Sequence, residues 1–549
     1  MLMLVIANNH LRAQGLPQIL ELADLNATSG VSGVVINGIS EQDYAGESIS
    51  NIGDFNNDGF DDIAIGSRAG TNGEYSGQVY IIFGNDTLPD RIELNALNNL
   101  SSPFGTAGIT FNGISAFDVA NVVSGIGDFD NDGISDIIIG APGSDSNGDN
   151  SGQCFVIFGS DSPFPKTVEL SELNDPLGVR GIVIHGVDAE DLTCNSVHSA
   201  GDLNNDSVDD LIIGAEDADP DNIPSGRSFV LFGTAGDAPA MIELRDLNAS
   251  PTVGVAGIKL NGNDFNEDSG YSVGDAGDIN GDGINEIIIG ARAADPNGRS
   301  SGRSYVIFGR SSGFPSVIEL RLLNTSAGED GMIFNGISED DLSGQVVNGL
   351  GDINSDGFDD FGIGTRNPGQ FGEPTGQSYV ILGSSNIVPG EFELSNLGSG
   401  SVPPGIIING NITIGGSFTA QTHINAAGDI NADGIDDFVI GASNGNPNGT
   451  NSGQSHVLFG RSEGFQGVIN LSELESDPNI DGMIINGKSA GDRSGFNVSY
   501  AGDINGDGTS DLMISSYLAS PNGTRSGQVY IVYGTETPDF LDGFESAIN

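Results

Sequence analysis

The chain alternates short apolar runs with polar, turn-forming stretches, and the runs recur in a fixed order of four. The first run alternates apolar and other residues between two glycines, as in GVVING from Gly33, and the second is rich in small residues, as in YSVGDAGD from Tyr271. The third is short and apolar, as in IIIG from Ile137, and the fourth ends in FG or a close variant, as in SYVIFG from Ser304. Such runs between turn signals indicate β-strands. Four short strands per unit are typical of a β-propeller blade.

An acidic pattern, Asp-x-Asn/Asp-x-Asp-x-x-x-Asp/Glu, lies between the second and third runs and recurs every 74 to 77 residues. Its seven copies start at Asp54, Asp128, Asp202, Asp278, Asp352, Asp429 and Asp503. A fixed long period indicates one supersecondary unit repeated around or along an axis. The sequence therefore predicts an all-β fold, a seven-bladed β-propeller whose small-residue strands lie near the axis.

The order of the runs at the two ends of the chain predicts how the ring closes. The chain enters the repeats on the GVVING strand but leaves them on VYIVYG, from Val529 to Gly534, with no eighth glycine-bounded strand after it. The N-terminal strand is thus available to complete the last blade, which removes the free sheet edges. A linear solenoid would carry polar capping units at its ends, and none is evident. We expect the propeller to occupy residues 16–534 as one domain.

Three further segments lie outside the four-strand pattern. Residues 1–15 begin with seven apolar residues but have no cationic region, so they resemble a remnant of a secretory signal. Residues 535–549 form an acidic C-terminal tail, either a sorting segment of the kind found on bacterial surface proteins or an ordinary disordered end. An IEL-like triplet between units, as in IELNAL from Ile92, is expected to be a linker strand or an edge cover.

Each acidic loop places oxygen ligands at positions 1, 3, 5, 7 and 9, with the backbone carbonyl serving at position 7. Hard oxygens at this spacing suit Ca²⁺, whereas Zn²⁺ would require Cys or His. An EF-hand is excluded because position 12 is an apolar strand residue such as Ile65. We expect up to seven Ca²⁺ ions as cofactors. The predicted ligands are Asp54, Asn56, Asp58, Phe60, Asp62; Asp128, Asp130, Asp132, Ile134, Asp136; Asp202, Asn204, Asp206, Val208, Asp210; Asp278, Asn280, Asp282, Ile284, Glu286; Asp352, Asn354, Asp356, Phe358, Asp360; Asp429, Asn431, Asp433, Ile435, Asp437; and Asp503, Asn505, Asp507, Thr509, Asp511.

Position 6 of the loop is Gly in six copies, where the chain must turn sharply and adopt a positive φ angle. The third copy has Ser207 at this position. A left-handed Ser costs about 1 to 2 kcal/mol, which would weaken a site roughly tenfold. We therefore expect the third site to be the weakest. Glu286, at position 9 of the fourth loop, has a longer arm that should still reach the ion.

The charge of the chain limits its partners. It has 18 Lys and Arg against 76 Asp and Glu, a formal net charge of -58. Such a field repels phosphate backbones and anionic lipids, so nucleic acid and acidic membranes are poor partners. No apolar run approaches the roughly 18 residues that a membrane span needs. We expect a monomer that is secreted or displayed at the cell surface.

Cys154 and Cys194 are the only cysteines. They occupy different places in the repeat, a strand position and a glycine position. A disulfide between neighbouring units is one interpretation, and two small, partly buried residues is the other. The sequence leaves this choice open.

The repeat resembles a known family. GDFNNDGFDDIAIG from Gly53 and GDINGDGINEIIIG from Gly277, followed by GQVYIIFG or SYVIFG, are similar to the FG-GAP repeats of the integrin α-subunit head. The resemblance covers residues 33–534 and implies a seven-bladed propeller. It also implies that the acidic loops lie on a lower face, and that connections such as residues 40–48 and 67–77 form the opposite face, where partners bind.

The departures from the integrin pattern limit what the resemblance implies. Integrin-type leg domains, an inserted metal-binding domain and a membrane helix are missing, and acidic loops occupy every blade rather than a subset. Heterodimerisation and signalling therefore do not carry over. The chain looks more like free-standing bacterial FG-GAP proteins, which are secreted or surface-displayed.

Catalytic residues are not evident in the sequence. GRSSG at Gly309 and GRSEG at Gly460 match a nucleophile elbow, but neither precedes a helix. His185 and His456 replace framework residues, and His198 and His423 could approach the axis without a paired nucleophile. We expect no enzyme and name no catalytic residue.

The function predicted from the sequence is a Ca²⁺-binding extracellular propeller that acts in adhesion or ligand binding. Its partner would be a protein or glycan on the face opposite the calcium loops, and the sequence does not identify that ligand. The alternatives are a propeller enzyme that acts on polysaccharide and a calcium-rigidified structural matrix protein. The enzyme would need His, Arg, Tyr and carboxylates clustered around one mouth of the ring.

Overall fold

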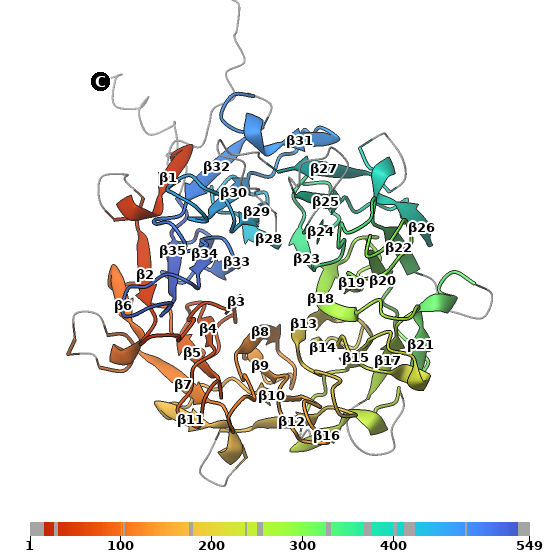
Figure 1. Cartoon of the computed structure of the whole chain (residues 1–549), viewed down its shortest axis with the longest axis horizontal. Coiled ribbons are helices and arrows are strands. Elements are labelled where there is room, and N and C mark those ends of the chain that lie inside the picture. The colour runs from red at the N-terminus through yellow and green to blue at the C-terminus, as the bar shows by residue number, and fades with distance from the viewer. Residues whose placement is uncertain are drawn as a thin grey trace, which may run out of the picture.

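The computed structural model describes residues 16–535, apart from 27–30, 100, 103–104, 175–178, 237–238, 250–255, 326–330, 367–375, 399–402, 411–422 and 478–479. Within these residues the strands form seven sheets of five strands each around a central axis (Figure 1). The predicted seven-bladed β-propeller is confirmed. The expected signal remnant, residues 1–15, and the acidic tail beyond residue 535 lie outside the described residues.

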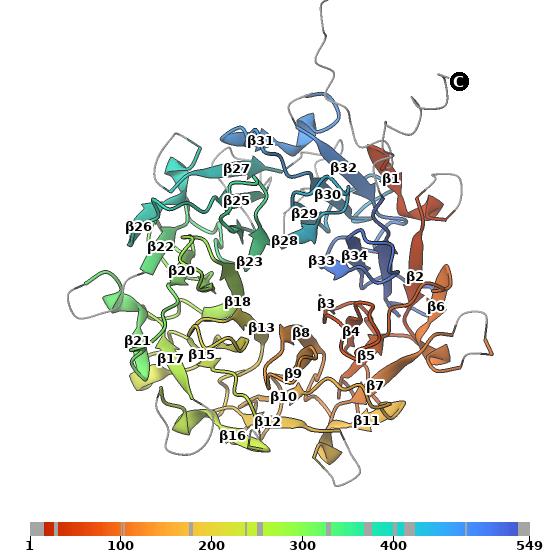
Figure 2. The ribbon, with the colours of Figure 1, turned by 180° about the vertical axis from the view of Figure 1, so that it is seen from behind.

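The first strand of each blade lies nearest the axis and leads into an acidic loop, from which the second strand leaves (Figures 1 and 2). We number the blades 1 to 7 by their first strands. These are β3 (Ser48–Asn51), β8 (Val122–Gly127), β13 (Ser196–Gly201), β18 (Ser269–Gly277), β23 (Val346–Gly351), β28 (His423–Gly428) and β33 (Val498–Gly502). The second strands are β4 (Ile63–Ser67), β9 (Asp136–Ala141), β14 (Asp210–Ala215), β19 (Glu286–Ala291), β24 (Asp360–Gly364), β29 (Asp437–Ala442) and β34 (Asp511–Ser516).

The third and fourth strands continue each sheet outward in antiparallel order. The third strands are β5 (Gln78–Ile82), β10 (Gln153–Ile157), β15 (Arg227–Leu231), β20 (Arg303–Ile307), β25 (Gln377–Ile381), β30 (Gln454–Leu458) and β35 (Gln528–Val532). The fourth strands are the glycine-bounded runs, β7 (Gly108–Asn112), β12 (Gly181–His185), β17 (Gly257–Asn261), β22 (Gly331–Asn335), β27 (Gly405–Asn409), β32 (Gly482–Asn486) and β2 (Gly33–Asn37). Each blade is therefore offset by one strand from the sequence repeat.

A fifth, parallel strand covers the outer edge of each sheet, which confirms the edge cover expected from the IEL-like triplets and adds one strand to the four of the repeat pattern. These strands are the IEL-like triplets: β11 (Thr167–Glu169), β16 (Met241–Glu243), β21 (Val317–Glu319), β26 (Gly390–Glu393), β31 (Val468–Asn470), β1 (Ile19–Glu21) and β6 (Arg91–Glu93). Each runs into a short 3₁₀ turn, and a further turn follows β14. The turns are η1 (Leu22–Asp24), η2 (Leu94–Ala96), η3 (Leu170–Glu172), η4 (Pro220–Asn222), η5 (Leu244–Asp246), η6 (Leu320–Leu322), η7 (Leu394–Asn396) and η8 (Leu471–Glu473).

Two strands from the N-terminal end close the ring. β2 is the fourth strand of blade 7 and pairs antiparallel with β35, with Gly33 opposite Val532 and Asn37 opposite Gln528. The predicted closure of the last blade is thus confirmed. β1 adds a second closure that the sequence did not predict, because it pairs parallel with β32 in blade 6, with Ile19 opposite Ile484.

The hydrophobic core lies between neighbouring blades. Successive side chains along each strand point to opposite faces of the sheet, so each strand contributes to the core on both sides. On β9, Ile137 and Ile139 pack toward blade 1, whereas Ile138 packs toward blade 3 beside Leu211 and Ile213. All of these side chains are fully buried. A strand buried on both faces reads as a continuous apolar run, which explains the IIIG pattern.

A chain of polar side chains crosses the outer half of a blade toward the edge strand. In blade 1 the Tyr80 hydroxyl donates to Gln78 Oε1 at 2.8 Å, Gln78 Nε2 donates to Asn112 Oδ1 at 2.6 Å, and Asn112 Nδ2 donates to Glu169 Oε1 at 2.6 Å. Asn72, in the loop after β4, also donates to Glu169. The Glu of the edge triplet therefore ties three segments together.

Blade 6 interrupts this polar chain because His456 replaces the Tyr. Gln454 Oε1 and both ring nitrogens of His456 are buried without a hydrogen-bond partner in the described structure.

We expect His456→Tyr to raise the free energy of unfolding by about 1 kcal/mol at neutral pH, because the phenol would donate to Gln454 Oε1. Chemical denaturation of the two proteins checks this. The variant His456→Phe is the matched control, and equal stability of the Tyr and Phe variants would contradict the proposed hydrogen bond.

The gain in the free energy of unfolding from His456→Tyr should also depend on pH. Burial lowers the pKa of His456 to about 4, below the roughly 6.5 of an unfolded chain. The folded state therefore binds fewer protons than the unfolded state between these values, and wild-type stability falls as pH drops through that interval. Both substitutions remove this loss, so their advantage over the wild type should grow from pH 6.5 toward pH 4.

Candidate metal centres

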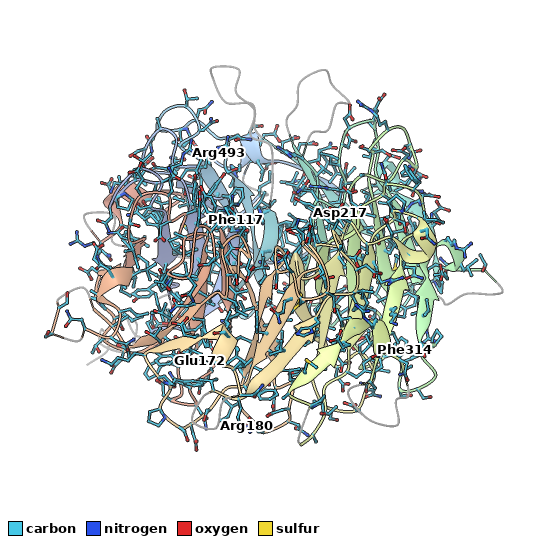
Figure 3. All side chains as sticks on the ribbon, turned by 60° about the horizontal axis from the view of Figure 1, so that its bottom comes forward. Phe117, Glu172, Arg180, Asp217, Phe314 and Arg493 are labelled. Atoms are coloured by element: carbon cyan, nitrogen blue, oxygen red, sulfur yellow. A yellow bond between two sulfur atoms is a disulfide. The ribbon has the colours of Figure 1, made fainter. Side chains whose placement is uncertain are left out.

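All seven acidic loops lie at the same end of the blades, because each connects the first strand to the second in the same register. We call this end the lower face. The upper face is formed by the connections from the fourth strand to the next first strand and from the second to the third strand. Figure 3 shows the two faces, with Phe117, Asp217 and Arg493 toward the upper face and Arg180 toward the lower. Arg180 lies 3.8 Å from Asp130 of the second acidic loop.

Each loop holds its own carboxylates with backbone amides. In blade 1, Asp54 accepts hydrogen bonds from the amides of Asp58 and Gly59, each at 2.9 Å, and Asp58 accepts one from Phe60 at 3.1 Å. The same three bonds recur in the other six loops. These backbone hydrogen bonds orient the carboxylates at positions 1 and 5.

The carboxylate at position 9 is fully buried in every loop. Asp62 illustrates the arrangement, because it accepts hydrogen bonds from Phe55 N at 3.1 Å and from Gly84 N at 2.9 Å. Burial, together with the carboxylates at positions 5 and 1, raises its pKa to about 8. The equivalent residues, also without exposed surface, are Asp136, Asp210, Glu286, Asp360, Asp437 and Asp511. Burial of a negative charge beside two other carboxylates is costly in free energy, and a bound cation would offset that cost.

Several oxygens at predicted ligand positions support a bound cation. Asp128, Asp130 and Asp136 bring one carboxylate oxygen each within 4.8 Å of one another. At position 3, the buried Oδ1 atoms of Asn56, Asp130 and Asn354 have no hydrogen-bond donor in the described structure. Oxygen acceptors without donors, and no His or Cys among them, fit Ca²⁺. The side chains at positions 1, 3, 5 and 9 would hold the ion together with the position-7 carbonyl.

The position-3 side chain is arranged differently in the other four loops. There its amide nitrogen donates to a carboxylate of the same loop: Asn204 to Asp210, Asn280 to Glu286, Asn431 to Asp433 and Asn505 to Asp507. A half-turn of the amide would present the oxygen to an ion instead. The loop hydrogen bonds thus recur in all seven predicted sets, in two arrangements of position 3, but among the described residues three carboxylate oxygens lie within 4.8 Å of one another only in the second loop.

Position 6 adopts the left-handed conformation in every loop. The φ angle is +95° at Gly59 and +69° at Ser207. We expect Ser207→Gly to strengthen Ca²⁺ binding at the third site about tenfold, because Gly removes roughly 1 to 2 kcal/mol of strain. Calorimetric Ca²⁺ titration of the variant and the wild type measures this. The reverse substitution Gly357→Ser, in the fifth loop, should weaken that site by a similar factor, and an unchanged titration in both variants would contradict the explanation.

Sequence reasoning missed the role of position 8. In four loops this residue is an Asp that accepts a hydrogen bond from the position-1 amide of the preceding blade. The pairs are Asp61 with Asp503, Asp209 with Asp128, Asp359 with Asp278, and Asp436 with Asp352, at 2.8, 2.8, 2.8 and 3.2 Å. Each such bond links the acidic loops of adjacent blades. The recurrence of Asp at position 8 was visible in the sequence, but its partner lies one repeat away.

A cavity of about 870 Å³ lies on the axis, bounded by the first strands of the blades. His198 and His423 both line it, as the sequence suggested. Burial lowers the pKa of both, to about 4 for His423, so their rings are neutral. His185 instead contacts Glu243 at the outer edge, 2.9 Å away. The GRSSG and GRSEG segments lie in turns after β20 and β30, and no helix follows them before the next strand.

The mouth of this cavity carries a charged cluster between blades 3 and 4. The guanidinium of Arg292 lies 3.4 Å from the centre of the Tyr271 ring and pairs with Asp268 at 3.1 Å and Glu216 at 3.4 Å. Burial raises the pKa of Glu216 to about 7. Asn195 donates to the same carboxylate at 3.0 Å. Arg292 and Asn195 therefore both bind the Glu216 carboxylate.

Cys154 and Cys194 form a disulfide, which resolves the pairing that the sequence left open. Cys154 lies on β10 of blade 2, and Cys194 precedes β13 of blade 3, so the bond joins two blades near the upper face. The positions equivalent to Cys154 and Cys194 also lie close together in other pairs of neighbouring blades. At the equivalent places, a Cβ added to Gly344 would lie 3.0 Å from Ser304 Oγ, and one added to Gly495 would lie 2.7 Å from Ser455 Oγ.

The sheets and loops define a class of protein, the β-propeller with seven blades and an acidic loop in each. Five segments match the FG-GAP repeat family, residues 45–82, 121–157, 270–307, 423–458 and 498–532. These segments span the first three strands of blades 1, 2, 4, 6 and 7. The chain is an FG-GAP repeat protein. No helix among the described residues is long and apolar enough to span a membrane.

Comparison with curated proteins gives similar relatives of two kinds. The chain is 28% identical to integrin alpha pat-2 of Caenorhabditis briggsae over 262 residues, which is 46% of this chain and 18% of that protein. It is 29% identical to integrin alpha-4 of Xenopus laevis over 166 residues, 30% of this chain and 14% of that protein. It is also 30% identical to phosphatidylinositol-glycan-specific phospholipase D of Dictyostelium discoideum over 203 residues, 34% of this chain and 19% of that protein. The chain thus spans less than a fifth of the length of these relatives.

Proposed function

We propose that this protein is a Ca²⁺-stabilised binding module that acts outside the cell in adhesion, with a protein or glycan ligand on its upper face. The observation that carries the proposal is the separation of the two faces. All seven acidic loops lie on the lower face, where each offers a set of hard oxygens suited to Ca²⁺. The upper face is left to connections that vary from blade to blade. The similarity to integrin α subunits supports a role in adhesion.

An extracellular setting fits both the metal loops and the disulfide. Extracellular Ca²⁺ modules bind the ion with dissociation constants of about 10⁻⁴ to 10⁻³ M, so in a cytosol such loops would be empty and mutually repulsive. The Cys154–Cys194 bond requires an oxidising compartment to persist. We infer a secreted or surface-displayed monomer with up to seven Ca²⁺ ions.

The charges on the upper face favour one sector for ligand binding. Loops 142–152, 186–195, 216–226 and 262–268 carry carboxylates and no Lys or Arg. Across the ring, loops 443–453, 487–497 and 517–527 carry Lys488, Arg493 and Arg525 and a single carboxylate, Asp492. A ligand that approaches the upper face therefore meets least repulsion over blades 6 and 7.

The experiment that tests this function is a binding screen against immobilised matrix proteins and glycans, run in millimolar Ca²⁺ and again with a chelator. We expect at least one ligand to be retained, and retention to disappear when Ca²⁺ is removed. Retention should also fall for Arg525→Glu on the upper face but not for Lys166→Glu, which follows β10 at the lower end. A stable Ca²⁺-loaded protein that retains no ligand would favour a calcium-rigidified matrix protein instead.

An enzyme is the second candidate, because Arg292, Tyr271 and the partly buried acid Glu216 gather at the mouth of the axial cavity. Relatives named phospholipase D also favour it. Assays for cleavage of polysaccharide and of phosphodiester substrates test this reading. Turnover that is lost in Glu216→Gln would support an enzyme, and absence of turnover beside retained ligand binding would leave adhesion.

A further inference from the structure

Aromatic rings from three blades form a continuous row from the axial cavity to the upper surface. His423, at the start of β28, lies 5.7 Å from Phe496, and Phe496 lies 4.1 Å from Tyr517, measured between ring centres. Tyr517 in turn lies 6.4 Å from Tyr44. We call these four residues the aromatic row. All four are partly exposed to solvent.

Two arginines flank the outer end of the row. The Arg68 guanidinium lies 5.7 Å from the centre of the Tyr44 ring and also pairs with Glu47. Arg525 donates to the Tyr44 hydroxyl at 3.4 Å. Cations over an aromatic face are attracted by its quadrupole, so these contacts hold the Tyr44 ring in place. The row is therefore a fixed surface feature of blades 6, 7 and 1.

The inner end of the row opens into the axial cavity, whose wall is polar. His423 and Phe496 both line this cavity. Two buried atoms of its lining, Gln345 Oε1 and Asn51 Nδ2, have no hydrogen-bond partner in the described structure. One is an acceptor and the other a donor. Hydroxyl and amide side chains supply much of the remaining wall, among them Ser50, Ser124, Ser272, Asn348, Asn425 and Ser499.

The ligand that fits these features has apolar ring faces and many hydroxyl groups. Flat aromatic side chains stack against the apolar face of a sugar ring, and a cavity of about 870 Å³ is within the usual range for ligand sites. Sugar hydroxyls can both donate to Gln345 Oε1 and accept from Asn51 Nδ2. A negatively charged sugar is disfavoured because Asp275 and Asp359 line the same cavity.

We propose that the aromatic row and the axial cavity together bind a neutral glycan, whose terminal residue enters the cavity while the following residues stack along Phe496, Tyr517 and Tyr44. This inference rests on the proposed function, since it identifies the ligand class for the upper face.

Calorimetric titration with neutral hexasaccharides tests the proposal. Cellohexaose, chitohexaose and mannohexaose are the probes, in millimolar Ca²⁺, with hyaluronan hexasaccharide as the anionic comparison and polyglutamate as an acidic peptide. We expect at least one neutral probe to bind and both anionic probes to bind more weakly or not at all. Tyr517→Ala should weaken binding at least about tenfold. Phe265→Ala is the matched control, because Phe265 is 70% exposed on the acidic half of the upper face.

A second variant keeps the test independent of any effect on folding. The chain has no Trp, so Phe496→Trp places a single Trp fluorophore in the aromatic row. A neutral probe should change its emission with the same affinity that calorimetry gives.

The proposal is overturned if no neutral probe binds, if an anionic probe binds as tightly as the best neutral one, or if Phe265→Ala weakens binding as much as Tyr517→Ala. If sugars fail but an immobilised matrix protein is still retained in Ca²⁺, only this inference falls, whereas loss of both removes the proposed function as well.

Discussion

Chelation of Ca²⁺ is expected to lower the melting temperature of this protein by about 10 °C. At free Ca²⁺ about tenfold above the dissociation constant, each site stabilises the folded chain by roughly 1.4 kcal/mol, so seven sites contribute about 10 kcal/mol. Unfolding entropy of roughly 2 cal/mol/K per residue converts that free energy into a shift of this size for a chain of 549 residues. Differential scanning calorimetry with and without a chelator measures it.

Two controls make the result specific to the acidic loops. Returning Ca²⁺ should restore the original melting temperature, and Mg²⁺ at the same concentration should restore less, because Mg²⁺ demands a near-octahedral site and sheds its water reluctantly. A melting temperature that does not respond to the chelator would show that the buried carboxylates at position 9, such as Asp62 and Asp437, do not need a cation.

Deletion of residues 1–38 is expected to abolish folding. This segment supplies β1 to blade 6 and β2 to blade 7, and with them the buried side chains of Leu20, Leu22, Val34 and Ile36. Burial of about 1.5 to 3 kcal/mol per apolar side chain makes the loss about 10 kcal/mol, comparable with the whole stability of a typical domain. The deletion also exposes the edges of β32 and β35, which promotes aggregation. Size-exclusion chromatography and circular dichroism would detect both effects.

The matched control removes only residues 1–15, which precede β1. That variant should remain soluble with an unchanged β-sheet spectrum. A folded, monomeric protein after the longer deletion would contradict closure by the N-terminal strands. Recovery of the fold on adding a synthetic peptide of residues 16–38 would support it directly.

The fold was predictable because each blade repeats the same physical pattern. Glycine-bounded runs, buried IIIG-type strands and acidic turns specify strand order and blade number, and the missing eighth glycine-bounded strand predicts closure through β2. The parallel edge strand was not predictable to the same degree. A strand such as β6, Arg91–Glu93, is too short to be indicated by its own sequence, and its pairing with β2 depends on the rest of the sheet being formed.

The candidate metal sites also have a part that could be predicted from the sequence and a part that could not. Oxygen spacing within one loop is local, so the predicted ligand positions from Asp54 to Asp62 could be read directly from the sequence. The contacts between loops are not local. Asp61 meets the amide of Asp503, and Cys154 meets Cys194, only because the ring places one blade against the next. The aromatic row likewise joins Tyr44 and Tyr517, which are distant in sequence and adjacent only after ring closure.

We expect each of the seven acidic loops to bind one Ca²⁺ ion. Equilibrium dialysis of the metal-free protein against increasing Ca²⁺, with bound metal measured by elemental analysis, counts the bound ions. We expect seven ions per chain at saturation, with the Ser207 site filling last. A folded protein that binds no Ca²⁺, or saturates at one or two ions, would contradict this expectation.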